Sequence, residues 1–532
     1  MDVVAPYDEG VLRQGLAHLV EAELMFQRGL WPQAHYRFKH ALIQDAAYNS
    51  LPKRRRQTMH WQTAQVLAAQ FPEIVTSQPE LLAQHFTAAN LTEQAVSYWQ
   101  QAGQLAVRRS AHQEAMGHFT TGLALLNMLP KTAARARQEI AIRLALGPVL
   151  RVIKGQQAPE IGLHYARAVE LCQRFGDTHY LFPALWRLQR AHLLRPELQK
   201  AREAAEHLLL QARDQQDNGL IIVAQLALGS TLYYLGEPAL AAAHATDGMA
   251  LYDPLLHHPL TMLYGGMDPG VSCQVHASSA LWLLGYSNQA LLQSQAAVAQ
   301  ARKLSHHFAL VQALLYAGLQ HQRRREASQV LELAATMITL ATEHGFFAHL
   351  EMGRILRGWS LCAEGHHEAG LASAQKGLKS LPAIGGKLGR PTWLSLLAVV
   401  YGQIVQPTEG LHILANALTH VAETGENCWQ AELYRLRGEL LLQTTHRIQV
   451  AESKPEACFL RALDIARQQQ AKSLELRAAT SLARLWQWEQ CQAAYDVLAP
   501  VYQWFTEGAD TADLQEASNL LATLTPGGHP SV

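Results

Sequence analysis

The architecture of this chain can be read from the stretch WQQAGQLAVRRSAHQEAMGHFTTG, which runs from Trp99 to Gly122. After Trp99, Gly103, Ala115, Phe119 and Gly122 follow at distances of 4, 16, 20 and 23 residues. Apolar residues in each half recur at three- and four-residue spacing, which is the period of an amphipathic helix. The stretch therefore predicts two helices joined by a short turn, with small side chains where the helices face each other.

The same arrangement recurs four more times along the chain. Equivalent small residues, from Ala241 through Ala290, Ala327 and Gly370 to Gly410, are separated by 49, 37, 43 and 40 residues. These units resemble the tetratricopeptide repeat (TPR), a helical hairpin, although their period exceeds the 34 residues of a standard unit. The recurring sets are Gly229, Gly236, Ala241 and Gly248; Gly285, Ala290 and Ala297; Gly358, Gly365, Gly370 and Gly377; and Tyr401, Gly410 and Ala417.

Small residues at these positions have a physical role in helix packing. A Gly or Ala at a crossing lets two helix axes approach to about 8–10 Å, whereas a larger side chain holds them apart. We therefore expect the substitution Gly365→Leu to loosen the stack and lower the melting temperature. Because each hairpin buries its apolar face only against its neighbours, the units must stack. The sequence predicts an all-α, TPR-like α-solenoid, a right-handed superhelix of helical hairpins.

Composition limits the classes of partner and site. Hydrophobic residues make up 49% and charged residues 17%, which indicates a folded chain. Lys+Arg and Asp+Glu both number 44, so the chain lacks the positive field of a dedicated nucleic-acid binder. The six cysteines form no C-x-x-C pair and the histidines no H-E-x-x-H motif, so no metal site is expected.

Localisation is predicted from the same features. The unpaired cysteines are typical of a reducing compartment, and the first residues, MDVVAPYDEG, lack the basic flank of a secretory signal. Two charge-free stretches, Asn218 to Gly236 and Pro269 to Ala301, are interpreted as buried helices of the repeat and not as membrane spans. We expect a cytoplasmic protein without membrane contact.

The chain is predicted to contain three segments. Residues 1–70 lack the repeat and carry the basic run from Lys53 to Arg56, which indicates a small helical or winged-helix domain. Residues 71–525 are expected to form the solenoid. Residues 526–532 have almost no apolar side chain to anchor them and are predicted to be a disordered tail.

Several phrases resemble one bacterial family. RFKHALIQDAAYNSL (Arg37 to Leu51), QPELLAQHFTAANLTEQAVSYWQQAG (Gln78 to Gly103) and LRGWSLCAEGHHEAGL (Leu356 to Leu371) are similar to signalling proteins that join a class III adenylate/guanylate cyclase domain, a STAND-type ATPase and a TPR array. The resemblance implies that this chain corresponds to the C-terminal half, beginning in the helical or winged-helix region after the ATPase. No G-x-x-x-x-G-K-[ST] phosphate loop occurs, so the chain is expected to hold no cofactor.

One candidate residue follows from this resemblance. The string FKHAL, residues 38–42, resembles the winged-helix histidine motif of STAND ATPases, which implies that His40 contacts a nucleotide phosphate when a partner supplies the ATPase domain. The alternative is a helix-face histidine with local partners. The run from Lys53 to Arg56 is interpreted as a solvated basic turn in preference to a nucleic-acid site.

Two further groups have structural interpretations. Arg323, Arg324 and Arg325 fall at a turn between two helices, where positive charge is favoured by the helix dipole. Several tryptophans are candidates for a ligand groove, but packing between helices is the favoured interpretation. These tryptophans are Trp282, Trp359, Trp393, Trp429, Trp486, Trp488 and Trp504.

The sequence predicts a binding protein and not an enzyme. No Gly-x-Ser-x-Gly elbow, paired carboxylate motif or Cys/His arrangement is present. We predict a non-catalytic TPR scaffold for protein interaction and signal sensing, with a protein or peptide ligand in the groove. The resemblance adds a second partner, an ATPase or cyclase domain encoded upstream. Two alternatives stay open: a free-standing TPR adaptor, and the sensor part of a STAND-type transcriptional regulator.

Overall fold

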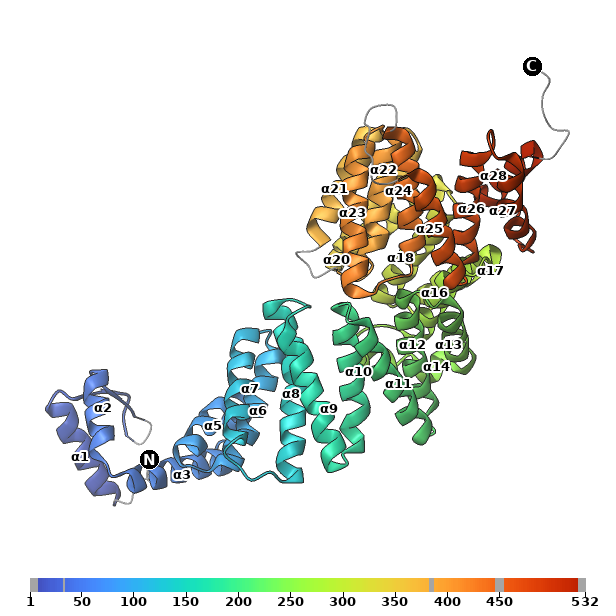
Figure 1. Cartoon of the computed structure of the whole chain (residues 1–532). Coiled ribbons are helices and arrows are strands. Elements are labelled where there is room, and N and C mark those ends of the chain that lie inside the picture. The colour runs from blue at the N-terminus through green and yellow to red at the C-terminus, as the bar shows by residue number, and fades with distance from the viewer. Residues whose placement is uncertain (1–7, 32–33, 382–386, 445–453, 525–532) are drawn as a thin grey trace. The chain divides into compact units, whose positions relative to one another are not determined.

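The computed structural model describes residues 8–31, 34–381, 387–444 and 454–524 (Figure 1). Nearly all of these residues lie in helices or the turns between them, which confirms the predicted all-α, TPR-like fold. The predicted tail, residues 526–532, lies outside the described residues.

The chain divides into two compact units. Unit 1 comprises residues 1–154 and 158–181, and unit 2 comprises residues 155–157 and 182–532. The sequence predicted a single array from residue 71 to residue 525. The boundary between the two units falls within that stretch, and each unit is described by itself.

Unit 1 begins with a segment that contains the two strands of the described chain. The strands pair antiparallel, with Met25 opposite Phe38. Leu16 and Met25 are the buried apolar residues of the stretch up to residue 50, so this segment has almost no core of its own. The elements are α1 (Glu9–Glu21), β1 (Met25–Arg28), β2 (His35–Phe38), α2 (Ala41–Ser50), α3 (Lys53–Gln70), α4 (Pro72–Ser77), α5 (Pro79–Ala88), α6 (Thr92–Arg108), α7 (His112–Leu126), α8 (Ala133–Lys154) and α9 (Pro159–Phe175).

Unit 2 continues with paired helices. Helix α10 (Thr178–Leu194) crosses the boundary between the units. The remaining helices are α11 (Leu198–Asp214), α12 (Asn218–Leu235), α13 (Pro238–Leu251), α14 (Pro254–His257), α15 (Leu260–Leu263), α16 (Pro269–Leu283), α17 (Ser287–Lys303), α18 (His307–Arg323), α19 (Ala327–Glu343), α20 (Phe347–Ala363), α21 (His367–Ser380), α22 (Arg390–Gln403), α23 (Pro407–Thr424), α24 (Gln430–Thr444), α25 (Pro455–Gln468), α26 (Lys472–Trp486), α27 (Cys491–Gln503) and α28 (Ala512–Leu524).

Local sequence signals set the ends of these helices. The Asp217 carboxylate accepts a hydrogen bond from the Leu220 amide (3.1 Å) and caps α12. Gly236 ends the same helix with a φ of 83°, a left-handed conformation that glycine adopts without steric cost. Pro238 then opens α13 at a position where its missing N–H is not needed.

Small residues allow close contact between the two helices of a pair. In α6 and α7, the Phe119 ring packs against Gly103, and the Ile142 side chain of the next helix, α8, approaches Gly122. In α20 and α21, a Cβ added to Gly358 would lie 2.6 Å from the main-chain nitrogen of Ala374. Because main-chain atoms cannot move aside, only glycine fits there.

The other predicted packing positions lie mostly at such crossings. A Cβ on Gly377 would lie 2.5 Å from the Glu351 carbonyl oxygen, one on Gly248 would lie 2.8 Å from Cys273 Sγ, and one on Gly410 would meet Leu440. Gly370 faces Gly358, and Gly229 lies against the main chain of α13. Trp99 is buried, and the alanines are fully buried at Ala115, Ala241, Ala290, Ala297 and Ala417.

Three predicted positions do not lie at helix crossings. Gly365 has a φ of +89°, and an added Cβ would find no atom within 4 Å, so the close crossing expected there is wrong. Gly236 and Gly285 also lie at turns, where their nearest neighbours follow the ends of later helices: Gln469 after α25 for Gly236 and Trp504 after α27 for Gly285. The sequence pattern mixed turn glycines with crossing glycines because spacing alone does not distinguish the two positions.

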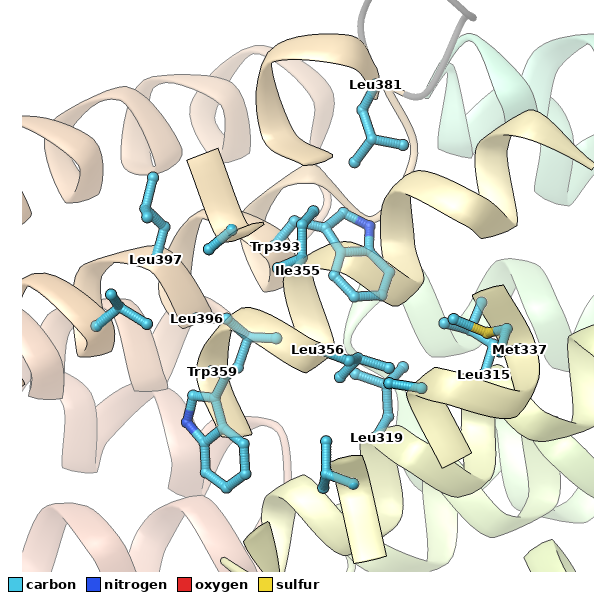
Figure 2. Packing of buried hydrophobic residues seen from close by; sticks show 14 of the residues in the cluster. Leu315, Leu319, Met337, Ile355, Leu356, Trp359, Leu381, Trp393, Leu396 and Leu397 are labelled. Carbon is cyan, nitrogen blue, oxygen red and sulfur yellow. The ribbon is translucent and has the colours of Figure 1, made fainter. Parts of the chain in front are cut away.

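One cluster of buried apolar residues in unit 2 extends from α18 to α22. Leu356 and Trp359 of α20 meet Leu396 of α22, while Trp393 lies beside Ile355 (Figure 2). The same cluster includes Leu315, Leu319 and Met337 from α18 and α19, so it joins several helix pairs. This is the arrangement expected of stacked repeats.

The first helices of the pairs, called here the inner helices, are α12, α16, α18, α20, α22, α24 and α26. Each contacts the next in this order, and α26 also contacts α16. The row from α16 to α26 is therefore closed on itself within unit 2. Helix α16, in the second charge-free stretch, belongs to this row. Helix α12 is the one described helix that is long and apolar enough to span a membrane, and 78% of it is buried inside the protein.

Candidate ligand cavity inside unit 2

A cavity of about 230 Å³ lies between the inner helices of unit 2. Helices α10, α12, α18, α20 and α22 contribute to its wall. The volume exceeds by far the space that one water molecule needs, so the cavity has room for part of an organic ligand. Much of its wall is apolar, from Leu194, Met267, Phe308, Leu315, Leu319 and Met352.

Tyrosines provide a polar part of the wall. Tyr233 and Tyr234 come from α12, and Tyr316 comes from α18. The Tyr234 and Tyr316 phenols lie close enough to influence each other's pKa. Burial raises the pKa of all three phenols, so they stay neutral and serve as hydrogen-bonding groups.

Arg190 is the charged residue of this wall. Burial lowers the pKa of His349 to about 4, so its imidazole is neutral near pH 7 and adds no charge. The Glu426 carboxylate lies behind the wall and accepts a hydrogen bond from the Gly389 amide (2.9 Å). Burial raises the pKa of Glu426, which opposes a negative charge at that position. Among the described residues of the wall, Arg190 is positively charged and none is acidic.

Trp393 lies in the wall with only 4% of its surface exposed. Its indole N–H has no hydrogen-bond acceptor among the described residues. A buried donor without a partner is energetically costly, so this group is available to a ligand. Arg190, Tyr234, Tyr316 and His349 are half-buried, which leaves the cavity accessible from solvent.

One wall residue also belongs to the contacts that close the row of inner helices. The Tyr233 hydroxyl accepts a hydrogen bond from Arg323 Nη2 (3.0 Å). The Arg323 side chain is 1% exposed, and its guanidinium carbon lies 5.2 Å and 5.4 Å from the ring centres of Trp282 and Trp429. Cation–π contacts of this kind are strong where water is excluded.

Helix α26 completes this closure. Arg477 Nη2 donates a hydrogen bond to the Arg323 carbonyl oxygen (2.6 Å), and its guanidinium carbon lies 4.9 Å from the ring centre of Trp282. Arg477 Nε donates to Asp513 (2.7 Å), and Nη1 donates to Glu432 (3.3 Å). We call Arg323, Arg477, Trp282 and Trp429 the closure cluster.

Further ion pairs surround the closure cluster. Arg325 contacts Asp513 (2.8 Å) and Glu516 (2.6 Å), and Arg324 contacts Asp510 (2.5 Å). Arg323, Arg324 and Arg325 lie at the turn between α18 and α19, as predicted, and they also make contacts that the sequence did not indicate. Arg323 and Arg324 are buried, and all three bind to segments more than a hundred residues away, a distance in sequence that no local pattern reveals.

His40 and the basic run from Lys53 to Arg56 do not belong to the lining of this cavity. His40 is exposed at the start of α2 in unit 1, and its side chain makes no capping hydrogen bond. The basic run from Lys53 to Arg56 opens α3, where Arg56 contacts Asn49 and the Tyr48 ring. Within the described residues, no group of three or more His, Cys, Asp or Glu side chains is placed to hold a metal ion.

Sequence reasoning missed the residues of the cavity. Of the tryptophans proposed for packing, Trp282, Trp359 and Trp429 are buried in the core, Trp393 also lines the cavity, and Trp488 is 81% exposed. Arg190 and the tyrosines of α12 and α18 were not singled out. Aromatic residues recur in the first helices of the pairs, at positions that the small-residue pattern does not use. This recurrence was a signal that could have indicated the cavity.

Comparisons with known proteins give distant matches. No family model matches the chain. An uncharacterized protein of Rhizobium meliloti (strain 1021) is 26% identical over 469 residues, which is 85% of this chain and 43% of the relative, so the chain spans less than half of that relative's length. A solved structure titled as a Rap protein complexed with competence and sporulation factor has 13% identity and a TM-score of 0.47, and covers 72% of this chain and 99% of that chain.

A second solved structure, titled as a STAND protein with a tetratricopeptide repeat sensor from Pyrococcus horikoshii, has 11% identity and a TM-score of 0.39. It covers 80% of this chain and 60% of that chain. At TM-scores below 0.5 these similarities carry no functional conclusion.

Proposed function

We propose that this chain is a non-catalytic scaffold for protein interaction and signal sensing, and that unit 2 is its sensing part. The observation that supports the proposal is that Tyr233 takes part in both the cavity and the contacts that close the row of inner helices. It lines the cavity, and it accepts a hydrogen bond from Arg323 of the closure cluster. A ligand in the cavity and the closure of the inner helices therefore act on the same side chain.

The proposed mechanism is a shift between closed and more open arrangements of unit 2. A ligand that contacts Tyr233 changes the stability of the hydrogen bond between Tyr233 and Arg323. Through Arg323 it also changes the stability of the contact with Arg477 on α26. A ligand shifts such an equilibrium only by its difference in affinity for the two arrangements. The resemblance to cyclase and ATPase signalling proteins extends the proposal: the arrangement of the array is relayed to an ATPase or cyclase domain.

Peptide-library selection on the immobilised full chain tests the proposal. We expect selected peptides to slow amide hydrogen exchange in the inner helices α12, α18, α20 and α22, and also in α26 because of the shared Tyr233. If the selected peptides protected only the second helices of the pairs, such as α13, α19 and α21, the proposal would be contradicted. In the Arg477→Met variant, protection of α12 should persist while the added protection of α26 is lost.

The non-catalytic part of the proposal has its own test. We expect the purified chain neither to hydrolyse ATP nor to form cyclic nucleotides. Measurable turnover that a single substitution within this chain abolishes would overturn that part and leave the peptide result unaffected.

We further propose that residues 8–50 dock on a partner domain of the ATPase class, as the resemblance implies, with His40 facing its nucleotide. Exposed apolar side chains support docking: Val11, Phe26, Leu30 and Leu42 are all more than half exposed. In the isolated chain, we expect amides of this segment to exchange far faster than those of α6 and α7. Equally slow exchange would show a self-sufficient domain and contradict the docking proposal.

A further inference from the structure

An acidic segment between α27 and the first turns of α28 crosses back to the earlier helices of unit 2. Its four carboxylates recur at every third residue, at Glu507, Asp510, Asp513 and Glu516. Each of them contacts either the beginning of α17 or the turn that follows α18. We call residues 504–516 the acidic strap.

The first carboxylate of the strap binds the beginning of α17. Glu507 Oε1 accepts hydrogen bonds from the main-chain amides of Asn288 (2.9 Å) and Gln289 (3.2 Å). Its Oε2 accepts a further hydrogen bond from the Gln289 side chain (3.1 Å). Amides in a first helical turn have no acceptor within their own helix, and the helix dipole favours a negative charge there. Because Tyr286 at the N-cap of α17 provides no side-chain acceptor, the strap supplies the cap.

The strap can leave this edge without disrupting the core of its own helices. A cluster of buried apolar residues within residues 459–524 holds α25, α26, α27 and α28 together, and none of its described members belongs to α16–α19. By contrast, the carboxylates of the strap make ion pairs in which Asp510, Arg325 and Glu516 are more than a third exposed. Ion pairs of this exposure are individually weak and are screened by salt.

The strap also covers the closure cluster. Strap residues Phe505, Thr511 and Asp513 line a space of about 10 Å³ together with Trp282 and Arg323. A space of this size holds about one water molecule. Arg323 is almost completely buried, and its cation–π contacts are strong because water is excluded. Displacement of the strap would therefore expose the contacts that close the row of inner helices.

We propose that the acidic strap is a releasable latch on the closure of the inner helices. In place, it keeps water away from the closure cluster; once released, it lets the row open between α26 and α16. This proposal rests on the proposed function, in which closure of the row carries the signal, and it adds the segment that regulates that closure. The helices α25–α28 keep their apolar core in both arrangements.

Hydrogen exchange of the full chain at two ionic strengths tests the latch. Charges interact over about 10 Å in about 0.1 M NaCl and over only about 3 Å in about 1 M NaCl. At the higher salt concentration, we expect residues 504–511 and the first turn of α17 to exchange about 10-fold faster, because several weak pairs are screened together. Helix α26 should also exchange faster, because the closure cluster loses its cover. The rates of α20 and α21 should stay unchanged.

Variants separate the charges of the strap from general effects of salt. Glu507→Gln combined with Asp510→Asn should give the fast exchange already in about 0.1 M NaCl and should remove most of its salt dependence. Asp496→Asn on α27 is the matched control, because Asp496 contacts Gln492 of the same helix, and it should keep the slow exchange. Unchanged rates of α20 and α21 show that the variants are folded. If the double variant does not fold, the salt series on the unchanged chain decides.

The outcomes distinguish this inference from the proposed function. Strap exchange that does not depend on salt, or a folded double variant with the rates of the unchanged chain, overturns the latch. Faster exchange of the strap without any change in α26 overturns its control of the closure. None of these results affects the proposed function, which fails when selected peptides leave the inner helices unprotected.

Discussion

The Arg477 guanidinium donates a 2.6 Å hydrogen bond to the main-chain carbonyl oxygen of Arg323, a residue 154 positions earlier in the chain. The carbonyl belongs to the last residue of α18, where helix carbonyls lack partners within the helix. A side chain of α26 therefore caps α18. Through this contact, an array that grows along one direction in sequence returns to its own earlier part within unit 2.

We expect Arg477→Met to destabilise unit 2 strongly. The substitution leaves the Arg323 carbonyl without this donor and removes a partner of the buried Glu432, and breaking buried pairs of this kind costs about 3–5 kcal/mol. Chemical denaturation monitored by fluorescence measures the free energy of unfolding. Arg484→Met on the same helix is the matched control, because its pair with Glu516 is half exposed, and should cost less than about 1 kcal/mol. Equal effects of the two variants on the free energy of unfolding would show that Arg477 does not close the row of inner helices.

The close crossing of α20 and α21 predicts a severe effect of one methyl group. Gly358→Ala places a Cβ 2.6 Å from the Ala374 nitrogen and the Gly370 carbonyl oxygen, so the helices must separate, at a cost of about 1–3 kcal/mol. Gly117→Ala is the control, because its Cβ meets nothing within 4 Å in α7, and it should leave stability unchanged or raise it. A harmless Gly358→Ala would contradict the crossing geometry.

Substitution at Gly365 should act through the backbone and not through packing. Its φ of +89° strains any side chain with a Cβ, so Gly365→Leu should lower stability by about 1–2 kcal/mol. Gly365→Asn should lower the melting temperature less, because Asn enters left-handed conformations more readily. If Asn and Leu lowered the melting temperature equally, backbone strain would not be the cause.

Acid should weaken the region around Glu432. Burial alone would raise the pKa of this carboxyl, but the charges of Arg435 and Arg477 outweigh it and lower the pKa from 4.5 to about 2. Because the folded state binds the proton less readily than the unfolded state, this stabilisation is complete above pH 4.5 and is lost as the pH falls toward about 2. Unfolding curves recorded across this range measure the loss.

A variant tests whether Glu432 carries this dependence. Glu432→Gln should be less stable near neutral pH and should lose part of the slope below pH 4.5. Glu423→Gln on the exposed face of α23 should retain the slope. The assignment fails if both variants keep the slope of the unchanged chain.

The candidate site was less accessible to prediction than the fold. Tyr233, Tyr316 and Trp393 come from three different helix pairs, and their meeting depends on how the pairs stack. No spacing within one repeat encodes this arrangement. His40, which does lie in a recognisable local motif, is exposed in unit 1. Its proposed role depends on a partner domain.

The sequence by itself determined the helices, their ends and their pairing. Apolar periodicity, caps such as Asp217 and small residues such as Gly358 act over a few residues or one hairpin, so a linear pattern records them. Tertiary structure alone decided the division into two units, the cavity at Arg190 and the contact between Arg477 and Arg323. Small differences in the angle between successive hairpins add up along the array, and their sum, which no single repeat contains, decides which distant side chains meet.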